Sequence, residues 1–226
     1  MRLYLARHGQ PALENMPKGA NYELPDGDYV LSVLGREQAH CLGVRLKEMH
    51  FSGKVFSSPY ARTMETASIA AAVCGLEVIP EPRMQEMRFS PEPPCPGMTL
   101  AELKKNYPNT ASDSELSYPW MLPQGPEDVS DVRKRIFPYV EELLAAPPAE
   151  EILLVGHGSS VGAVKTFMIE KAGYTGYPGY NWNASLCTFD ISGDGSVKII
   201  ELNAIDFMPL EKVTSNKRLY GDPECV

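Results

Sequence analysis

The chain has 226 residues, and its 21 basic and 29 acidic side chains give a formal net charge of −8. This length favours one domain over two full domains, and the negative charge is opposite to the basic surface that a nucleic-acid backbone requires. Five cysteines without a Cys-x-x-Cys pair indicate neither a disulfide framework nor a zinc site, and no apolar run reaches the roughly 18 residues of a membrane helix. We therefore expect a single cytoplasmic domain over 1–226 without nucleic-acid or membrane partners.

Strands and helices alternate in the predicted secondary structure. Four apolar runs are too short for helices and predict buried strands, at Met1–Ala6, Lys54–Phe56, Val78–Ile79 and Ile152–Val155. Apolar positions three to four residues apart predict the helices between and after them, at Leu34–Met49, Tyr60–Val73, Asp128–Leu144 and Val161–Lys171. This alternation is typical of an α/β fold with a mostly parallel central sheet and helices on both faces.

Three further segments complete the predicted architecture. Leu186–Ile191 and Val197–Leu202 flank an Asp-Gly turn, which predicts an antiparallel hairpin at the edge of the sheet. Ten of the 20 prolines lie between Pro80 and Pro126, so we interpret 87–126 as a proline-rich lid insertion above the carboxyl ends of the strands; a plain surface loop is the alternative. Residues 207–226 lack periodicity and are expected to form a C-terminal tail.

Two of the four histidines follow predicted strands in similar settings. His8 stands in Arg7-His8-Gly9 after the first strand, and His157 stands in Gly156-His157-Gly158 after another. The carboxyl ends of parallel strands share one edge of a sheet, and the glycines would let a ligand approach the backbone there. His40 and His50 belong to a solvated helical segment and receive no role.

Two arginines extend this pattern. Arg7 precedes His8, and Arg62 follows the second strand in the run from Ser57 to Ala67. The planar guanidinium group suits phosphate better than a lysine ammonium does. Two arginines and two histidines at neighbouring strand ends would surround one small dianion, so the sequence predicts a phosphate pocket with one imidazole free to attack. A surface salt bridge remains the alternative for either arginine alone.

Several separated motifs together resemble the histidine phosphatase superfamily, which includes the phosphoglycerate mutases. The resemblance extends in the family's order from the start of the chain to about residue 160, with weaker matches at Gly97-Met98-Thr99 and from Pro123 to Arg135. The motifs are Arg7-His8-Gly9, Leu31-Ser32 with Leu34-Gly35-Arg36-Glu37-Gln38-Ala39, Ser58-Pro59 with Arg62 and Thr66-Ala67, Glu86, and Val155-Gly156-His157-Gly158.

The resemblance implies a mechanism and roles for these residues. His8 would be the nucleophile that forms a phosphohistidine, with its far ring nitrogen held by a backbone carbonyl. Arg7, Arg62 and His157 would bind the phosphoryl oxygens, and Glu86 would protonate the leaving oxygen and then activate water. Neither a metal nor another cofactor is expected. The resemblance thus implies metal-independent phosphoryl transfer. The negative net charge favours a small phosphorylated metabolite as the substrate, and the few basic side chains of the predicted lid favour a phosphatase.

The chain departs from the family pattern at two places. Relatives often carry an acidic residue where this chain has Gln10, and their phosphate-contacting asparagine stands one place earlier than Asn15. Asn15 is therefore only a candidate phosphate-binding residue. The substrate side of the pocket is expected to be particular to this chain, with four candidate specificity residues in the predicted lid, namely Lys104, Lys105, Tyr118 and Trp120.

Three other functions compete with this reading. The run Gly158-Ser159-Ser160-Val161-Gly162 fits the nucleophile elbow of serine hydrolases, but that fold places its histidine after the nucleophile, and no histidine follows His157. A non-catalytic phosphate-binding interaction protein and a phosphoglycerate mutase-type phosphoryl transfer are kept as alternatives. A mutase needs basic groups that bind a second anion, and the predicted lid holds few of them. Arg83 or Arg88 would supply such a group if its side chain turned toward the pocket. The physiological substrate and the oligomeric state stay open.

Overall fold

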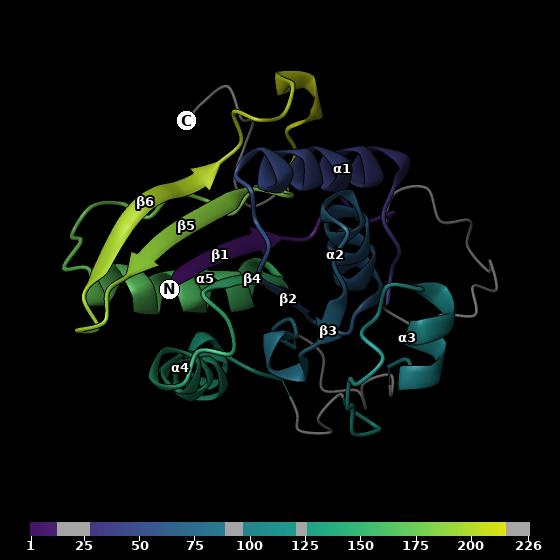
Figure 1. Cartoon of the computed structure of the whole chain (residues 1–226), viewed down its shortest axis with the longest axis horizontal. Helices are drawn as coiled ribbons and strands as arrows, with labels where there is room; N and C mark the ends of the chain where they lie inside the picture. The colour runs from purple at the N-terminus through teal and green to yellow at the C-terminus, as the bar shows by residue number, and fades with distance from the viewer. Residues whose placement is uncertain (13–27, 89–96, 121–125, 216–226) are drawn as a thin grey trace.

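The computed structural model describes residues 1–12, 28–88, 97–120 and 126–215 of the chain. Within them, six strands form one sheet in the order β3-β2-β4-β1-β5-β6 (Figure 1). The strands are β1 Arg2–Arg7, β2 Lys54–Ser57, β3 Val78–Pro80, β4 Glu151–Gly156, β5 Leu186–Ile191 and β6 Val197–Ala204. The first four run parallel, and β5 and β6 form the expected antiparallel hairpin at the edge.

Helices cover both faces of this sheet, as the sequence predicted. The α-helices are α1 Val33–Glu48, α2 Ala61–Cys74, α3 Leu100–Asn106, α4 Val129–Ala145 and α5 Gly158–Lys171. In Figure 1, α1 and α2 lie on one side of the strands, and α4 and α5 lie on the other. None of the helices in the described ranges is long and apolar enough to cross a membrane.

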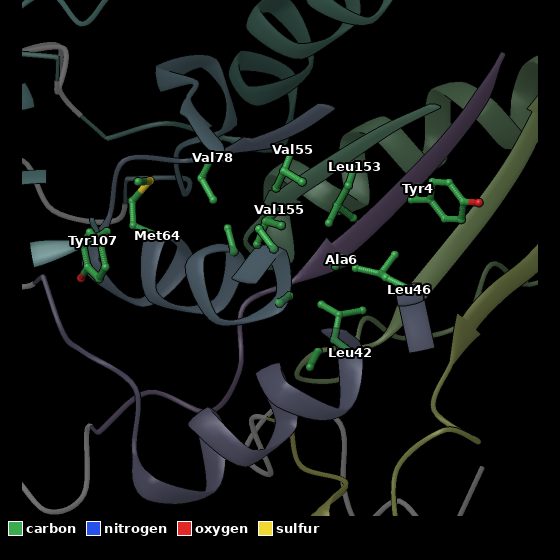
Figure 2. Packing of buried hydrophobic residues seen from close by; sticks show 14 of the residues in the cluster. Tyr4, Ala6, Leu42, Leu46, Val55, Met64, Val78, Tyr107, Leu153 and Val155 are labelled. Carbon is green, nitrogen blue, oxygen red and sulfur yellow. The ribbon is translucent and has the colours of Figure 1, made fainter. Parts of the chain in front are cut away.

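Alternating side chains of the central strands build two cores. On β1, Tyr4 and Ala6 pack with residues of α1 and α2, whereas Leu3 and Leu5 pack with residues of α4 and α5. Figure 2 shows the first core, where the β1 side chains meet Leu42 of α1. Because neighbouring residues of a strand point to opposite faces, a parallel strand buried on both sides needs a nearly continuous apolar run.

The connections of β1 and β4 make the centre of the sheet a topological switch point. These strands are neighbours, yet the chain leaves β1 for α1 on one face and leaves β4 for α5 on the other. Open α/β sheets bind ligands at such a point, at the carboxyl ends of the strands. His8 and His157 are the residues that follow these two ends.

The segment 87–126 contains more regular structure than a loop, in the parts that the structure describes. Thr99 begins α3 with a capping box, in which its side chain accepts from the Glu102 N–H while Glu102 accepts from the Thr99 N–H. Leu103 and Tyr107 are buried in the α1/α2 core. Residues 97–111 therefore belong to the body of the domain. The Pro91–Pro96 run lies outside the described residues, and the lid stays a prediction.

Two other expectations change in detail. The helix after β4 begins at Gly158, three residues before the predicted start, because the His157 N–H donates to Ser160 Oγ at 3.0 Å and closes the first turn. In the predicted tail, Met208 and Val213 are buried and enclose a 3₁₀ turn over Leu210–Lys212. Residues 216–226 lie outside the described ranges.

Candidate active site

The nucleophile candidate His8 is held in one tautomer. Its Nδ1 lies 2.7 Å from the Gly9 carbonyl oxygen, which can only accept, so Nδ1 carries the proton and Nε2 presents a lone pair. Burial, together with the charges of Arg7 and Arg62, lowers the pKa of His8 well below 6.5. The ring is therefore neutral and oriented at neutral pH, which is the state that a nucleophilic imidazole requires.

The loop that carries His8 is fixed from several elements. The His8 N–H donates to the Gly156 carbonyl at 2.9 Å and thereby joins the ends of β1 and β4. The Gly9 N–H donates to Thr66 Oγ1 of α2 at 3.0 Å, and the Asn183 amide donates to the His8 carbonyl at 3.1 Å. Neither Thr66's contact nor Asn183's follows from a local sequence pattern.

His157 lies directly beside His8. The ring centroids are 5.3 Å apart, and His157 is fully buried. Its Nε2 lies 2.9 Å from Ser58 Oγ, while its Nδ1 has no hydrogen-bond partner within the described ranges. Burial and the charge of Arg62 are the main causes that lower the pKa of His157 well below 6.5. The pocket thus holds two neutral imidazoles.

Both predicted arginines lie at the same strand ends. Arg7 Nη1 donates to the Asn181 carbonyl at 2.8 Å. Arg62, in the first turn of α2, has a side chain only 11% exposed, and its Nη1 finds no hydrogen-bond partner in the part of the chain that the structure describes. A buried guanidinium nitrogen without an acceptor is costly, and an oxyanion in the pocket would satisfy it.

Asp28 is a site residue that the sequence reasoning missed. Its side chain is completely buried, and Oδ1 accepts from the Ala61 N–H at 2.7 Å and lies 3.9 Å from Arg62 Nη1. Burial raises the pKa of Asp28 to about 7, although Arg62 and the Ala61 N–H both act to lower it. This carboxyl is the only anionic neighbour that the ion pairs of the described residues give to Arg62.

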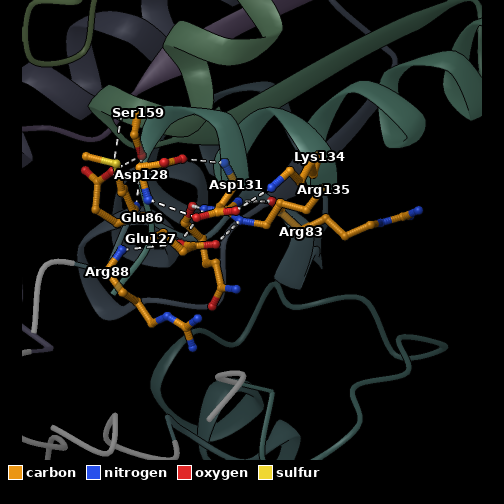
Figure 3. A network of polar contacts seen from close by, with 11 residues as sticks. Arg83, Glu86, Arg88, Glu127, Asp128, Asp131, Lys134, Arg135 and Ser159 are labelled. Atoms are coloured by element: carbon orange, nitrogen blue, oxygen red, sulfur yellow. Dashed lines mark hydrogen bonds and ion pairs between the residues drawn. The ribbon is translucent and has the colours of Figure 1, made fainter. Parts of the chain in front are cut away.

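Glu86 lies at the start of α5 (Figure 3). Its Oε1 accepts from the Ser159 hydroxyl, from the Ser159 N–H at 3.3 Å and from the Met87 N–H at 2.8 Å. Ser159 is the second residue after His157, so Glu86 contacts the loop that carries this histidine. Arg135 of α4 fixes the loop before Glu86, because its guanidinium donates to the carbonyls of Arg83 and Gln85 at 2.6 and 2.9 Å.

The remaining candidates divide into three groups. Asn15 lies outside the described residues. Lys104 donates to the Ser112 carbonyl at 2.8 Å on the surface. Lys105 and Tyr118 are exposed, and no hydrogen bond or ring contact joins them to His8 or His157 within the described ranges. Only Trp120 among the four specificity candidates reaches the site, because its ring lies 5.2 Å from that of Tyr60, which itself contacts His157 at 5.0 Å.

Gly9 and Gly158, the glycines that follow the two histidines, differ in their structural surroundings. A side chain at Gly9 would meet the Gly35 carbonyl oxygen at 2.5 Å, so this glycine lets α1 pack against the loop after β1. The expectation that Gly9 also lets a ligand approach the backbone stays a prediction. At Gly158 the nearest atom to an added Cβ is Arg7 Nε at 4.0 Å, and that side of the loop is open to a ligand.

Comparisons with known proteins found a matching family model and similar proteins. The family model of the Histidine phosphatase superfamily (branch 1) matches residues 3–204. A probable phosphoglycerate mutase of Yersinia pestis is 26% identical over 173 residues, which cover 75% of each chain. Among solved structures, a mycobacterial glucosyl-3-phosphoglycerate phosphatase with inorganic phosphate is 23% identical, with a TM-score of 0.58 over 92% of this chain and 99% of that chain. The alpha-ribazole phosphatase of Shigella flexneri is 20% identical, with a TM-score of 0.60 over 90% and 96%.

Proposed function

Because the chain belongs to the histidine phosphatase superfamily, we propose that it hydrolyses a small phosphorylated metabolite through a phosphohistidine on His8. The observation that carries this proposal is the orientation of the ring, whose Nδ1 is held by the Gly9 carbonyl and whose Nε2 carries a lone pair. A lowered pKa keeps that lone pair available at neutral pH.

The proposed reaction has two steps. In the first, His8 Nε2 attacks phosphorus, the bond to the leaving oxygen breaks, and Glu86 gives its proton to that oxygen. In the second, Glu86 takes a proton from water, the water oxygen attacks phosphorus, and the P–N bond breaks to release phosphate and His8. Arg7, Arg62 and His157 would stabilise the charge on the transferring group. These two guanidinium groups supply the positive charge, so we propose that hydrolysis needs no metal ion.

The engagement of Arg83 and Lys104 favours a phosphatase over a mutase, whereas the Nε and Nη1 atoms of Arg88 are buried without a hydrogen-bond partner in the described part of the chain and favour the mutase. Arg83 donates to Glu81 and to Glu142 and lies 4.0 Å over the Tyr139 ring, so it is directed toward α4. Of the lysines in the predicted lid, Lys104 is turned to a surface carbonyl. The two solved relatives described above are named phosphatases, whereas the curated relative is named a probable mutase, which keeps the mutase as the second candidate.

A covalent trapping experiment tests the proposal. The protein is mixed with ³²P-labelled phosphomonoesters in EDTA and quenched within milliseconds, and we expect acid-labile, base-stable label on the wild type. The His8→Ala variant should lose the label and at least 10³-fold of turnover, whereas His40→Ala, a matched change on the exposed face of α1, should keep both. Wild-type turnover by His8→Ala would refute the nucleophile, and activity restored only by a divalent ion would refute metal independence.

A second measurement separates the remaining alternatives. The protein is supplied with 3-phosphoglycerate and a catalytic amount of the bisphosphorylated primer, and products are followed by phosphorus NMR. We expect free phosphate to form faster than 2-phosphoglycerate; the reverse order would make the protein a mutase. Phosphate binding without turnover of any substrate in a broad panel would support the non-catalytic alternative.

A further inference from the structure

The Arg62 guanidinium needs something to hold it in place, because its own hydrogen bonds do not. Its ion pair with Asp28 spans 3.9 Å, beyond hydrogen-bond distance, and Nη1 has no partner within the described ranges. The contact that does define its position is with an aromatic ring: the Arg62 Cζ lies 4.6 Å from the centroid of Tyr60. A cation over a ring face is attracted by the ring quadrupole and keeps its N–H groups, which lie in the guanidinium plane, available for an anion.

The same ring also supports the second phosphate-binding candidate. The ring centroids of Tyr60 and His157 are 5.0 Å apart with an interplanar angle of 80°, an edge-to-face arrangement. One side chain therefore contacts Arg62 of α2 and His157 after β4, two groups that come from distant parts of the sequence. A shift of this ring would move both.

Trp120 holds the Tyr60 ring in turn. The two centroids are 5.2 Å apart at 76°, and Trp120 is 3% exposed. The indole N–H of Trp120 donates to the Met98 carbonyl at 2.8 Å, which fixes the indole. The position of the Tyr60 ring is thus set by a buried, hydrogen-bonded neighbour.

The position of Tyr60 at the start of α2 indicates that the aromatic ring, and not helix capping, is the reason for a tyrosine there. It is the N-cap of α2, a position where Ser, Thr, Asp and Asn are preferred, and it makes no side-chain capping bond. The Asp28 carboxylate supplies an acceptor for the Ala61 N–H instead. A residue that breaks a local rule while a distant group compensates is typical of a functional position.

We propose that Tyr60 is a positioning residue that holds Arg62 and His157 in register around the phosphoryl group. The proposal rests on the proposed function, in which these two side chains bind that group. It assigns to Tyr60 no contact with the reacting atoms.

Three substitutions of Tyr60 test this role. Tyr60→Phe keeps the ring face and edge, whereas Tyr60→Leu and Tyr60→Met remove them and keep an apolar side chain. Binding of inorganic phosphate by calorimetry and the kcat and KM for p-nitrophenyl phosphate are measured for each variant. We expect Tyr60→Phe to stay within about twofold of the wild type and Tyr60→Leu or Tyr60→Met to lose about tenfold in phosphate affinity, with a thermal midpoint close to that of Tyr60→Phe. Tyr174→Leu, the same change on the surface after α5, should bind phosphate as the wild type does.

A double-mutant cycle shows whether Tyr60 acts through Arg62. In an Arg62→Gln background, which has no cation over the ring, Tyr60→Leu should cost clearly less than it does in the wild type, because only the His157 contact remains to be lost. Equal phosphate affinity in Tyr60→Phe and Tyr60→Leu, or full additivity with Arg62→Gln, would overturn the proposal. If Tyr60→Leu does not fold, Tyr60→Met decides the comparison.

Phosphate binding also separates this proposal from the proposed function. A wild type that binds phosphate yet hydrolyses no phosphomonoester would refute the phosphatase, while the role of Tyr60 would still be judged from the affinities of the variants. A wild type that binds no phosphate would refute both.

Discussion

At the scale of single residues, the role of Glu86 makes the sharpest prediction. Glu86→Gln keeps the shape of the side chain and removes its acidic proton. We expect kcat for alkyl phosphates to fall by about 10²–10⁴, because a poor leaving oxygen needs protonation, and kcat for p-nitrophenyl phosphate to fall far less. Steady-state kinetics on the two substrate classes measures this difference. Glu102→Gln, a matched change in the capping box of α3, serves as the control; equal losses on both classes would remove Glu86 from this role.

The residues of the pocket differ in how far the sequence could identify them. His8, Arg7, Arg62 and His157 stand in short motifs directly after predicted strands, so the fold class alone places them at one edge. Asp28 and Tyr60 carry no such signal, because each matters through a contact with Arg62 that depends on the packing of several elements. The absence of a capping side chain at Tyr60 is the one local anomaly that could have been noticed.

At the scale of elements, the residues typical of helix ends indicate the helix bounds better than the spacing of apolar residues alone. Gly75 ends α2 in the left-handed conformation with φ 72°, which glycine adopts readily, and it stands two residues after the end of the predicted helix. Asp128 begins α4 as its N-cap with a capping box. Helix α3 was missed although Thr99 and Glu102 form the same kind of motif, because seven residues are too few for periodicity to show and prolines surround them.

The packing of α1 against α2 predicts the effect of one added methyl group. A Cβ at Gly43 of α1 would lie 2.9 Å from the Ala70 Cα and 2.9 Å from Val73 Cγ2 of α2, so Gly43→Ala must push the helices apart. We expect it to lower the free energy of unfolding by about 1–3 kcal/mol despite the better helix propensity of alanine. Urea unfolding measures this. Gly193→Ala, where an added Cβ meets nothing within 4 Å, should change stability by less than about 0.5 kcal/mol, and a similar small change for Gly43→Ala would contradict the argument.

At the scale of the whole molecule, the sequence predicts a mostly parallel sheet, but it does not predict the order of the strands within that sheet. The alternation of strands and helices indicates parallel pairing, and the Asp-Gly turn indicates the hairpin. The position of β4 between β2 and β1 depends on which strand edges meet in space, with registers such as Leu3 opposite Ile152 and Val55 opposite Leu153. Nothing within a short window of the sequence encodes such a choice.

The buried titratable groups predict how stability depends on pH between 5 and 6.5. His8 and His157 stay neutral in the folded protein and become protonated on unfolding, since the pKa of each is lowered on folding, so each makes stability fall as pH falls. Asp28 has its pKa raised to about 7 and acts in the opposite sense, because its contribution is present below 3.8 and lost as pH rises toward 7. Near pH 5 one histidine is left uncompensated, which gives a net slope of about 1.4 kcal/mol per pH unit, and this slope decreases toward pH 6.5 as the histidines of the unfolded chain lose their protons.

Two variants change this slope in opposite directions. Asp28→Asn should roughly double it, since both histidines then act without opposition, and His8→Gln should bring it close to zero. Urea unfolding at several pH values across this range gives the three slopes. The same slope in all three proteins would contradict the assignment of these groups.

The insertion of β4 between β2 and β1 has a consequence for the protein while it is still being synthesised. Strands β1 and β2 have no direct pairing with each other, so no sheet joins them until residues 151–156 have left the ribosome. The Asn183 contact to His8 requires a still longer nascent chain. A chain interrupted before β4 therefore carries the complete Arg-His-Gly motif but no pocket, and its exposed strand edges would make it a client for chaperones instead of a partially active enzyme.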